Sequence, residues 1–473
     1  MAKNYDLVLL GGGTGGYVAA IRASQLGLKT AIVEREKLGG TCLHKGCIPT
    51  KAFLRSAEVL ATVRGAEQFG ISVTGTMLSF HKVQERKQKI VDQLHQGVVK
   101  LMKKGKIDVY SGEGHLLGPS IFSPLPGAVS VTYSDGRESD VLTGDKVILA
   151  TGSRPRPLNG LAFDSECVLS SEDALALQTC PQSLVIVGGG VIGAEWASLM
   201  RDFGADVTVL EYADRLIPSE DKELSRRLAA SFKKRGIRVH TGAEVLPNTL
   251  KKQANGIEID AVLDGQQQTF AAEKMLVSVG RLPNTSDIGL DNTAIETDKG
   301  FICVNKFGQT KDSHIYAIGD VVGGLQLAHV AAREGIQAVD HLAGREVVPI
   351  TPFDVPRCIY TRPEIATVGM SEGEARAGHA VKVGKVPFGA IGKALVYGES
   401  EGYAKIIADE ATDDILGVQI IGPHATDLIG EASLAQLLNA SPWELAQAVH
   451  AHPTLSEVLG EAALAVDGNG IHV

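Results

Sequence analysis

The chain has 473 residues, of which 44% are hydrophobic and 21% are charged, and its formal net charge at pH 7 is −9. At about 150 residues per domain, this length predicts roughly three domains, and the hydrophobic content excludes a disordered chain. The acidic balance argues against nucleic acid as a partner. No apolar run is long enough to span a membrane, and the first expected strand begins by Tyr5, which leaves no room for a signal peptide. We therefore expect a cytoplasmic protein with neither membrane nor nucleic acid as a partner; the mature form of a protein that has lost a targeting segment is the alternative.

The N-terminal segment predicts a unit that binds a dinucleotide. An apolar strand runs into a glycine-rich loop, a helix follows, and a second strand ends at an acidic residue. Glycines allow the tight turn and the close approach of a pyrophosphate, and the acid can accept hydrogen bonds from ribose hydroxyls. In chain order these features are the strand 6–10, Gly11, Gly13 and Gly16, the helical stretch through Leu26, the strand 30–33 and Glu34.

A cysteine pair follows this unit directly. Cys42 and Cys47 would place two thiols beside a bound dinucleotide, an arrangement that can pass two electrons between sulfur and a redox cofactor. A zinc site that includes His44 is the alternative, but no second Cys or His pair stands at ligand spacing. In a reducing compartment a close pair is more often catalytic than structural. We expect His44 and Lys45 to add positive charge to the loop and to favour the thiolate.

The other cysteines are isolated in the sequence, and we expect them to be small buried hydrophobic residues. They are Cys167, Cys180, Cys303 and Cys358. The stretch 84–102 carries apolar residues at helical spacing between charged ones, which predicts a long packed helix and not a nucleic-acid arm.

A second glycine-rich unit repeats the first. In both units the acid falls 23 positions after the first glycine, and each unit is followed later by an apolar strand that ends in glycine. Such a matched duplication predicts two dinucleotide sites; the alternative is two glycine-rich turns that bind nothing. The second unit comprises the strand 183–187, Gly188, Gly190, Gly193, the strand 207–210 and Glu211, and the later strands end at Gly152 and Gly280.

The remaining sequence divides the chain. Residues 1–145 and 281–350 are predicted to form one split domain, 146–280 a second one inserted into it, and 351–473 a third. The third segment mixes alternating strands, 403–407 and 416–421, with C-terminal helices, as in an α+β domain.

Near the C-terminus, Ser441 and Pro442 predict the start of a helix that continues through Val449, and Pro453 prevents its extension. Thr454 and Glu457 fit the pattern of a capping box before a further helix. Glu457 therefore has a structural interpretation beside any catalytic one.

These motifs together resemble the dihydrolipoyl dehydrogenase family of class I pyridine nucleotide-disulfide oxidoreductases, over essentially the full length. The most specific segments are 39–51 around the cysteines, 315–320 and 450–457. The commoner family pattern has Asn and Val at the positions of His44 and Lys45. The resemblance implies an α/β fold with two Rossmann-like domains, one for FAD and one for NAD, and a C-terminal α+β dimerisation domain.

The resemblance also implies the activity. Protein-bound dihydrolipoyl groups would be oxidised to lipoyl through a Cys42–Cys47 disulfide and FAD, with reduction of NAD⁺. His452 would take the substrate proton and Glu457 would orient its imidazole. The implied partners are a second copy of the chain, in a homodimer, and the lipoyl domains of an acyltransferase or of the glycine cleavage carrier protein.

The cofactor-binding residues follow by position in the family motifs, and no metal site is implied. Glu195 would pair with Lys51 beside the flavin, although an ordinary salt bridge is the alternative for that pair. The residues assigned to FAD are Gly11, Gly13, Gly16, Glu34, Thr41, Lys51, Gly114, Thr151, Gly152, Glu195, Asp320 and Ala328. Those assigned to NAD are Gly188, Gly190, Gly193, Glu211 and Gly280.

Three other functions compete with this interpretation. A glutathione-type reductase prefers NADP(H), whose 2′-phosphate Glu211 would repel, and no arginine follows within two residues. A mercuric reductase needs a C-terminal cysteine pair, which 465–473 lacks. A flavoprotein scaffold for a multienzyme core, with incidental catalysis, would be separated from an enzyme by the turnover of free dihydrolipoamide.

Overall fold

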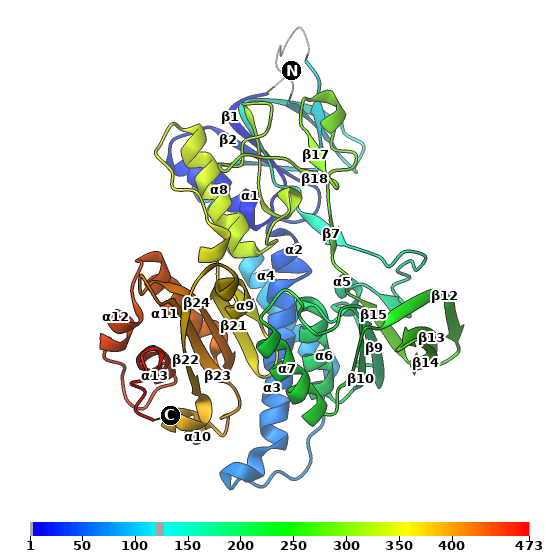
Figure 1. Ribbon diagram of the computed structural model, residues 1–473. Coiled ribbons are helices and arrows are strands. Elements are labelled where there is room, and N and C mark those ends of the chain that lie inside the picture. The colour runs from blue at the N-terminus through cyan, green and yellow to red at the C-terminus, as the bar shows by residue number, and fades with distance from the viewer. Residues whose placement is uncertain (1–2, 120–126, 473) are drawn as a thin grey trace. The chain divides into compact units, whose positions relative to one another are not determined.

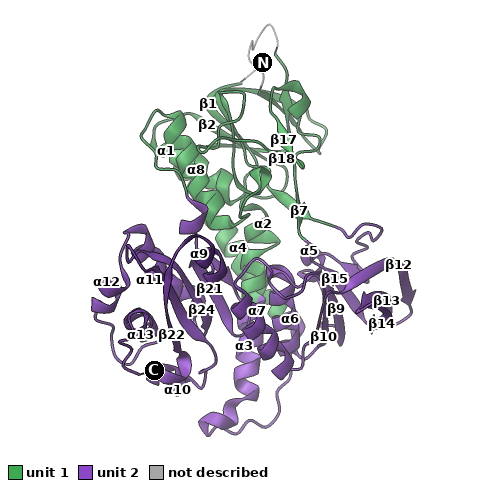
Figure 2. Ribbon diagram, viewed as in Figure 1, with its two compact units in different colours: residues 1–52, 82–156, 280–350 green, residues 53–81, 157–279, 351–473 purple. Residues whose placement is uncertain are grey.

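The computed structural model describes residues 3–119 and 127–472. These residues form an α/β fold with two Rossmann-like units and a C-terminal α+β domain (Figure 1). The chain separates into two compact units, which Figure 2 colours differently. Unit 1 comprises 1–52, 82–156 and 280–350, and unit 2 comprises 53–81, 157–279 and 351–473. The predicted division into three domains is finer than this and stays a prediction.

Unit 1 is built on a mixed sheet with the strand order β3-β2-β1-β6-β5-β4, in which β19 also pairs with β6. The strands next to β1 run parallel to it, as in a βαβ unit, whereas β4 and β5 form an antiparallel extension. The strands are β1 (Lys3–Leu10), β2 (Thr30–Glu34), β3 (Asp108–Ser111), β4 (Glu113–Leu117), β5 (Ala128–Thr132), β6 (Asp140–Leu149) and β19 (Ile315–Ala317).

The central strand β1 is apolar because both faces of the sheet are covered. Leu7 and Leu9 belong to the core shared with helices α1 (Thr14–Gln25) and α8 (Ala328–Leu342), whereas Val8 and Leu10 belong to the core on the opposite face. Successive side chains of a strand alternate between faces, so a strand buried on both faces must be hydrophobic throughout.

Three further helices follow the glycine loop of unit 1, and the boundary between the units falls within the last two of them. Helix α2 (Gly40–His44) is short, α3 (Cys47–Arg64) begins at the second cysteine, and α4 (Phe80–Lys104) confirms the predicted long helix. The smaller elements of this unit are β7 (Ser153–Pro155), β16 (Arg281–Pro283), η2 (Leu290–Asn292), β17 (Thr297–Asp298), β18 (Phe301–Ile302) and η3 (Gly319–Val322).

The first half of unit 2 repeats the βαβ design. A parallel sheet has the order β11-β10-β9-β15-β8, and a separate antiparallel sheet follows in the order β12-β13-β14. The elements are η1 (Ala66–Phe69), β8 (Val168–Leu169), α5 (Ser171–Ala174), β9 (Ser183–Val187), α6 (Val191–Phe203), β10 (Asp206–Glu211), α7 (Lys222–Lys234), β11 (Arg238–Thr241), β12 (Glu244–Gln253), β13 (Gly256–Leu263), β14 (Gln266–Ala272) and β15 (Lys274–Val277).

The second half of unit 2 is an antiparallel sheet in the order β20-β21-β24-β23-β22, packed against α11 and α13. Its core joins the strands to these helices. The elements are η4 (Pro352–Asp354), β20 (Arg357–Ile359), β21 (Glu364–Gly369), α9 (Glu372–Gly378), β22 (Val381–Pro387), η5 (Phe388–Ala390), α10 (Gly392–Tyr397), β23 (Tyr403–Asp409), β24 (Ile415–Gly422), α11 (Ala425–Leu437), α12 (Pro442–Gln447) and α13 (Glu457–Val466).

Two local predictions at the C-terminus need correction. Helix α12 begins at Pro442 with Ser441 as its cap, as expected, but ends at Gln447, so Val449 lies outside it and is fully exposed. Helix α13 is capped by Ser456 and not by Thr454. The Thr454 hydroxyl donates to the Ala451 carbonyl instead, so only the Glu457 half of the predicted capping box forms.

The expected burial of the isolated cysteines was also wrong. Cys303 is exposed, and Cys167, Cys180 and Cys358 are only partly buried. Cys303 directly follows the short edge strand β18, so the sheet core does not cover it.

Candidate active site

The first glycine loop forms a cradle at the N-terminus of α1. Gly11 has a φ of +107°, and a Cβ there would lie 2.2 Å from the Ala150 carbonyl oxygen. A Cβ at Gly16 would lie 2.0 Å from the Gly11 carbonyl oxygen, so only glycine allows the helix to approach this closely. Gly13 precedes α1 and provides no side-chain cap. The free N–H groups of the first turn are therefore available to a phosphate.

Glu34, at the end of β2, lies against the first glycine loop. Its Oε2 accepts a hydrogen bond from the Gly12 N–H and its Oε1 one from the Glu36 N–H, each at 2.7 Å. Burial raises the pKa of Glu34, although both N–H groups act in the opposite direction. A carboxylate oxygen can accept more than one hydrogen bond, so the fixed carboxylate can still bind ribose hydroxyls.

The second glycine loop reproduces this geometry. Gly188 has a φ of +102°, with a Cβ position 2.6 Å from the Ser278 carbonyl oxygen, and a Cβ at Gly193 would lie 1.9 Å from the Gly188 carbonyl oxygen. Gly190 caps α6 without a side chain and faces open space. Glu211 accepts hydrogen bonds from the N–H groups of Gly189 and Ala213. The duplication seen in the sequence is thus a duplication of two cradles.

The cysteine loop lies directly beside the first cradle. The Gly39 N–H donates to the Gly12 carbonyl at 2.8 Å, and this bond places α2 next to the glycine loop. Cys42 lies on α2 and Cys47 is the first residue of α3, and both are thiols in this structure.

The two thiols interact. The hydrogen bond between Cys42 and Cys47, and then burial, raise the pKa of the Cys42 thiol. The hydroxyl of Thr14 and the charge of Lys51 act in the opposite direction. The sequence-based expectation of a favoured thiolate is therefore wrong for Cys42 in this dithiol state, because the neighbouring sulfur and burial outweigh the nearby cation.

The positive charge expected from His44 is absent, and that of Lys45 is paired with a carboxylate. Burial lowers the pKa of His44, so its imidazole is neutral at pH 7, and His44 Nε2 lies 2.9 Å from the Leu38 carbonyl oxygen. His95 Nδ1 lies 3.0 Å from the same oxygen. Lys45 forms an ion pair with Glu36 at 2.6 Å. Both residues of the cysteine loop are thus engaged by neighbouring groups, and the charge of Lys45 is paired with that of Glu36.

Ser153 and Arg281, which the sequence motifs did not single out, form a polar cluster with Asp320. Asp320 lies on η3 and accepts a hydrogen bond from the Ser153 hydroxyl. Arg281 Nε donates to Ser153 Oγ at 2.6 Å and its Nη2 donates to the Ser153 carbonyl at 2.8 Å. Ser153 and Arg281 immediately follow Gly152 and Gly280, so their position after the two strand-ending glycines was the available signal.

Other residues assigned to FAD lie at the ends of unit 1 elements. Thr151 Oγ1 donates to the Asn284 carbonyl at 2.7 Å. Gly114 lies against Leu10, whose Cδ1 would be 2.2 Å from a Cβ there. Thr41 lies on α2 and Ala328 is the first residue of α8, which has no side-chain cap.

His452 and Glu457 form a close pair in unit 2. His452 Nδ1 lies 2.8 Å from Glu457 Oε1, and the Thr454 N–H donates to Glu457 Oε2 at 2.8 Å. Burial raises the pKa of Glu457, but its bonds to His452 and Thr454 outweigh burial and hold that pKa below its usual value. Glu457 thus holds the imidazole through Nδ1. The His452 side chain is 79% exposed.

Three assigned residues are divided between the units. Lys51 and Gly280 belong to unit 1, whereas Glu195 belongs to unit 2, where its Oε1 accepts from the Tyr360 N–H at 3.0 Å. The Lys51–Glu195 pair and the contribution of Gly280 to the NAD site therefore stay predictions. Within the part of the chain that the structure describes, no cluster of His, Cys, Asp and Glu could hold a metal ion, and no helix is long and apolar enough to cross a membrane.

Comparison with known proteins assigns this arrangement to a family. Residues 5–335 match the sequence model of the pyridine nucleotide-disulphide oxidoreductases, and residues 355–463 match that of their dimerisation domain. The chain belongs to this family. As a family member it is a flavoprotein oxidoreductase that uses FAD and NAD and forms a homodimer.

Individual relatives match this oxidoreductase over its whole length. It is 63% identical to a dihydrolipoyl dehydrogenase of Bacillus subtilis, with 100% of both chains covered, and 39% identical to one of Zymomonas mobilis, again with 100% of both covered. Among solved structures, LpdA of Mycobacterium tuberculosis is similar, with a TM-score of 0.90, 28% identity and coverage of 98% of this chain and 99% of that one. The flavoprotein disulfide reductase RclA of Escherichia coli, solved as a Cu(II) complex, matches with a TM-score of 0.85 at 26% identity, over 98% of this chain and 99% of RclA.

Proposed function

We propose that this protein oxidises protein-bound dihydrolipoyl groups to lipoyl and reduces NAD⁺ to NADH. The observation that carries the proposal is the thiol pair Cys42 and Cys47, which lies directly beside the first of two dinucleotide cradles. The first cradle serves FAD and the second serves NAD. Dihydrolipoyl dehydrogenases that match over their full length support this choice of substrate.

The reaction of the chain's own groups combines a proton transfer at His452 with thiol–disulfide exchange at Cys42 and Cys47. His452 takes a proton from one substrate thiol through Nε2, and Glu457 stabilises the imidazolium that forms. The substrate thiolate attacks Sγ of Cys42 in the oxidised Cys42–Cys47 pair; the sulfur–sulfur bond breaks and Cys47 leaves as a thiolate. The second substrate thiol, as its thiolate, then attacks the substrate sulfur bound to Cys42. Cyclic lipoyl is released, and the cysteine pair holds the two electrons.

The cofactor sites fit their proposed ligands. The uncapped first turns of α1 and α6 suit a pyrophosphate, and the fixed carboxylates of Glu34 and Glu211 suit ribose hydroxyls. When bound, FAD supplies the transfer of the electron pair from the reduced sulfurs to NAD⁺ as a hydride. Asp320 is proposed to hold the ribityl or pyrophosphate part of FAD, and the assigned residues Lys51, Glu195 and Gly280 complete the two sites.

We also propose the setting of the reaction. The substrates are lipoyl domains of an acyltransferase of a 2-oxoacid dehydrogenase complex or of the glycine cleavage carrier protein. His452 completes the active site of the other subunit, and the exposure of its side chain supports this arrangement. A cytoplasmic location is proposed because a thiol pair that cycles through its reduced form suits a reducing compartment.

The competing functions have less support. A preference for NADP(H), as in glutathione-type reductases, would place a phosphate beside the buried Glu211 carboxylate. The C-terminal residues 465–473 contain no cysteine for the second pair of a mercuric reductase. A scaffold with incidental catalysis would turn over free dihydrolipoamide poorly.

The proposal is tested with Cys47→Ser, because one sulfur cannot form the internal disulfide. The flavin content of the purified variant should match that of the wild type, since the FAD contacts lie in the glycine loop, Glu34 and Asp320. NAD⁺ reduction with dihydrolipoamide should fall to background. Cys303→Ser is the matched control, because that exposed thiol lies outside the site, and it should keep full turnover. Near-normal turnover of Cys47→Ser would refute the two-thiol mechanism.

A further inference from the structure

The loop 212–221 joins β10 to α7 and packs against the second glycine loop. The Ile217 N–H donates to the Gly189 carbonyl at 2.8 Å, and the Ala213 N–H donates to Glu211 Oε1 at 2.6 Å. Leu216 is buried so tightly under the glycine loop that its Cδ2 lies 2.6 Å from where a Cβ of Gly189 would be. A displacement of this loop would therefore move both the glycine loop and the carboxylate of Glu211.

Ile217 adopts an unusual backbone conformation in this loop. Its φ is +41°, in the left-handed region, and its side chain is completely buried. A β-branched residue rarely adopts a positive φ, because Cβ then crowds the backbone. In the first cradle the equivalent hydrogen bond, to the Gly12 carbonyl, comes from Gly39, with a φ of +109°. The second cradle thus uses a strained isoleucine where the first uses glycine, and a strained residue persists only where its surroundings hold it.

The end of the loop next to α7 is held by the antiparallel sheet β20-β21-β24-β23-β22, called the C-terminal sheet below. Glu220 is buried, its Oε1 lies 3.2 Å from Nε of Arg357 on β20, and its Oε2 accepts a hydrogen bond from the Thr367 hydroxyl on β21 at 2.8 Å. Both partners come from the segment that matches the family's dimerisation domain. Charge-assisted hydrogen bonds to a buried carboxylate are among the stronger polar contacts in proteins.

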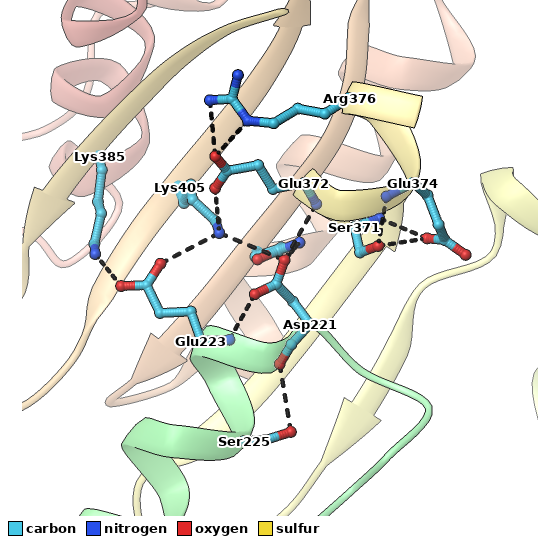
Figure 3. Close-up of polar contacts among 10 residues, drawn as sticks. Asp221, Glu223, Ser225, Ser371, Glu372, Glu374, Arg376, Lys385 and Lys405 are labelled. Carbon is cyan, nitrogen blue, oxygen red and sulfur yellow. Dashed lines mark hydrogen bonds and ion pairs between the residues drawn. The ribbon is translucent and has the colours of Figure 1, made fainter. Parts of the chain in front are cut away.

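Asp221 provides a second anchor, seen in Figure 3. Its Oδ2 accepts hydrogen bonds from the Glu372 N–H at 3.1 Å and from Gln419 Nε2 at 3.3 Å, and it lies 3.6 Å from Nζ of the fully buried Lys405. Burial raises the pKa of Asp221, but the Glu223 N–H and the charge of Lys405 outweigh burial and hold the pKa low. Asp221 therefore stays ionised and fixed to the C-terminal sheet at neutral pH.

We infer that Glu220 and Asp221 are positioning residues for NAD⁺: through them the C-terminal sheet holds the loop 212–221 and keeps Ile217 in the conformation that supports the second glycine loop. The inference rests on the proposed NAD site at Gly188, Gly190, Gly193 and Glu211. It gives the dimerisation domain a role in nucleotide binding within its own chain, in addition to its role in assembly. Neither anchor touches the nucleotide in this account; both act through the loop.

The test measures the two substrates of the holoenzyme separately. Glu220→Gln replaces one carboxylate oxygen by an amide N–H, which faces the donors of Arg357 or Thr367 and weakens the anchor. We expect the KM for NAD⁺ to rise about five- to tenfold, and the NAD⁺ dissociation constant measured by titration to rise with it. The KM for dihydrolipoamide and the flavin content should stay within about twofold of the wild type. A tenfold change corresponds to about 1.4 kcal/mol.

Rescue separates positioning from general destabilisation. Glycine adopts the left-handed conformation without strain, so a loop with Ile217→Gly no longer depends on the anchor. The double variant Glu220→Gln/Ile217→Gly should return the KM for NAD⁺ to within about twofold of the value for Ile217→Gly alone. Thr367→Val, which removes a single hydrogen bond to Glu220, is a milder variant should the first fold poorly, and we expect a two- to threefold rise.

Two further variants calibrate the result. Asp413→Asn weakens the Lys382–Asp413 ion pair, remote from the loop in the sequence, and should leave the KM for NAD⁺ unchanged. Glu211→Gln reports on the NAD site itself.

The outcomes of these variants separate the inference from the proposed NAD site. If Glu211→Gln raises the KM for NAD⁺ while Glu220→Gln and Thr367→Val do not, the inference is overturned and the NAD site stands. An effect of Glu220→Gln that glycine at 217 fails to relieve also overturns it. If Glu220→Gln acts with rescue but Glu211→Gln does not act, the anchor stands and the assigned role of Glu211 falls.

Discussion

Glu211 is the residue that we propose to decide which nucleotide the second cradle accepts. It is buried, and its two carboxylate oxygens accept hydrogen bonds from the Gly189 and Ala213 N–H groups, so its position is fixed before a ligand arrives. A ribose hydroxyl can donate to such a carboxylate, whereas a phosphate brings like charge and no donor. The residues that follow, Tyr212 and Ala213, supply no cation that could compensate.

We therefore expect a preference for NAD⁺ over NADP⁺ of at least about tenfold in kcat/KM. Hydrogen bonds to a charged group contribute about 1.5–3 kcal/mol, and about 1.4 kcal/mol is already a factor of ten. Comparison of kcat/KM for the two nucleotides, with dihydrolipoamide held at saturation, measures the preference. Equal use of NADP⁺ would instead favour the function of a glutathione-type reductase.

Ile217 shows how a single residue can depend on distant ones. Residues in sparsely populated backbone regions cost about 1–3 kcal/mol each and persist where the surrounding structure determines them. The groups that hold the two anchors, Glu220 and Asp221, come from β20, β21, β23, β24 and α9, all more than 130 residues further along the chain. The strain is local, but the groups that hold it are not.

Strand β23 carries a buried cation of unit 2. Each of its residues is buried, and its third residue, Lys405, is 1% exposed and lies between the three carboxylates drawn in Figure 3. Lys405 Nζ lies 3.0 Å from Glu372, 3.3 Å from Glu223 and 3.6 Å from Asp221. A buried cation of this kind needs such partners, since an unpaired charge in the core is strongly unfavourable.

Removal of this cation should lower the free energy of unfolding far more than removal of a surface lysine. Lys405→Met leaves three carboxylates without a cation in a buried site, and we expect about 3–5 kcal/mol of destabilisation at pH 7. Lys382→Met breaks the more exposed pairs with Asp413 and Asp467 and should cost less than about 1 kcal/mol. The melting temperatures of the two holoenzyme variants measure the difference. Similar melting temperatures would refute the special role of Lys405.

The same cluster predicts a pH dependence. Burial raises the pKa values of Asp221, Glu223 and Glu372, but the nearby hydrogen bonds and cations outweigh burial and hold all three below their usual values in the folded protein. Groups with lowered pKa values stabilise the fold above about pH 4–5, and this contribution is lost as the pH falls through their folded values. In Lys405→Met protonation relieves repulsion instead. The difference in stability between wild type and variant should therefore shrink between about pH 5 and 3, and a constant difference would contradict this account.

The assembled molecule is a homodimer, and the proposal for His452 makes the dimer the functional unit. Cys42 and Cys47 belong to the N-terminal part of the chain, whereas His452 lies on the segment that matches the dimerisation domain. Glu457, the partner of His452, comes from the same chain, five positions away. One subunit can therefore contribute both members of the acid–base pair to a site on the other subunit.

Complementation of inactive variants tests the shared site. Cys47→Ser and His452→Gln, dissociated together and allowed to reassemble, give about half mixed dimers by random pairing. If sites are shared, each mixed dimer has one site with both lesions and one with none, so about a quarter of all sites should be active. The activity of the mixture, with mixed dimers counted by mass, is the measurement. Activity at background despite mixed dimers would show that each site is built from one chain.

The sequence by itself determined the features that depend on neighbouring residues. Glycines that need a positive φ or a close approach, such as Gly11 and Gly188, can be recognised because no other residue fits there, and the spacing to Glu34 and Glu211 follows from the length of a βαβ unit. The continuous apolar run at 6–10 likewise predicted β1, and the helical spacing of apolar residues predicted α4. The cysteine pair stood out because both thiols lie in one short segment.

Only the tertiary structure decided the properties that depend on burial and on partners distant in the sequence. His44 is neutral because burial penalises its charge, and the thiol pKa of Cys42 rises because its neighbour is another sulfur. Thr454 was mistaken for a cap because its hydroxyl has a nearer acceptor in the folded chain. The anchors on the loop 212–221 could not be predicted for the same reason: Asp221 and Gln419 are 198 positions apart, and no local pattern records a hydrogen bond that forms only when this loop packs against a distant strand.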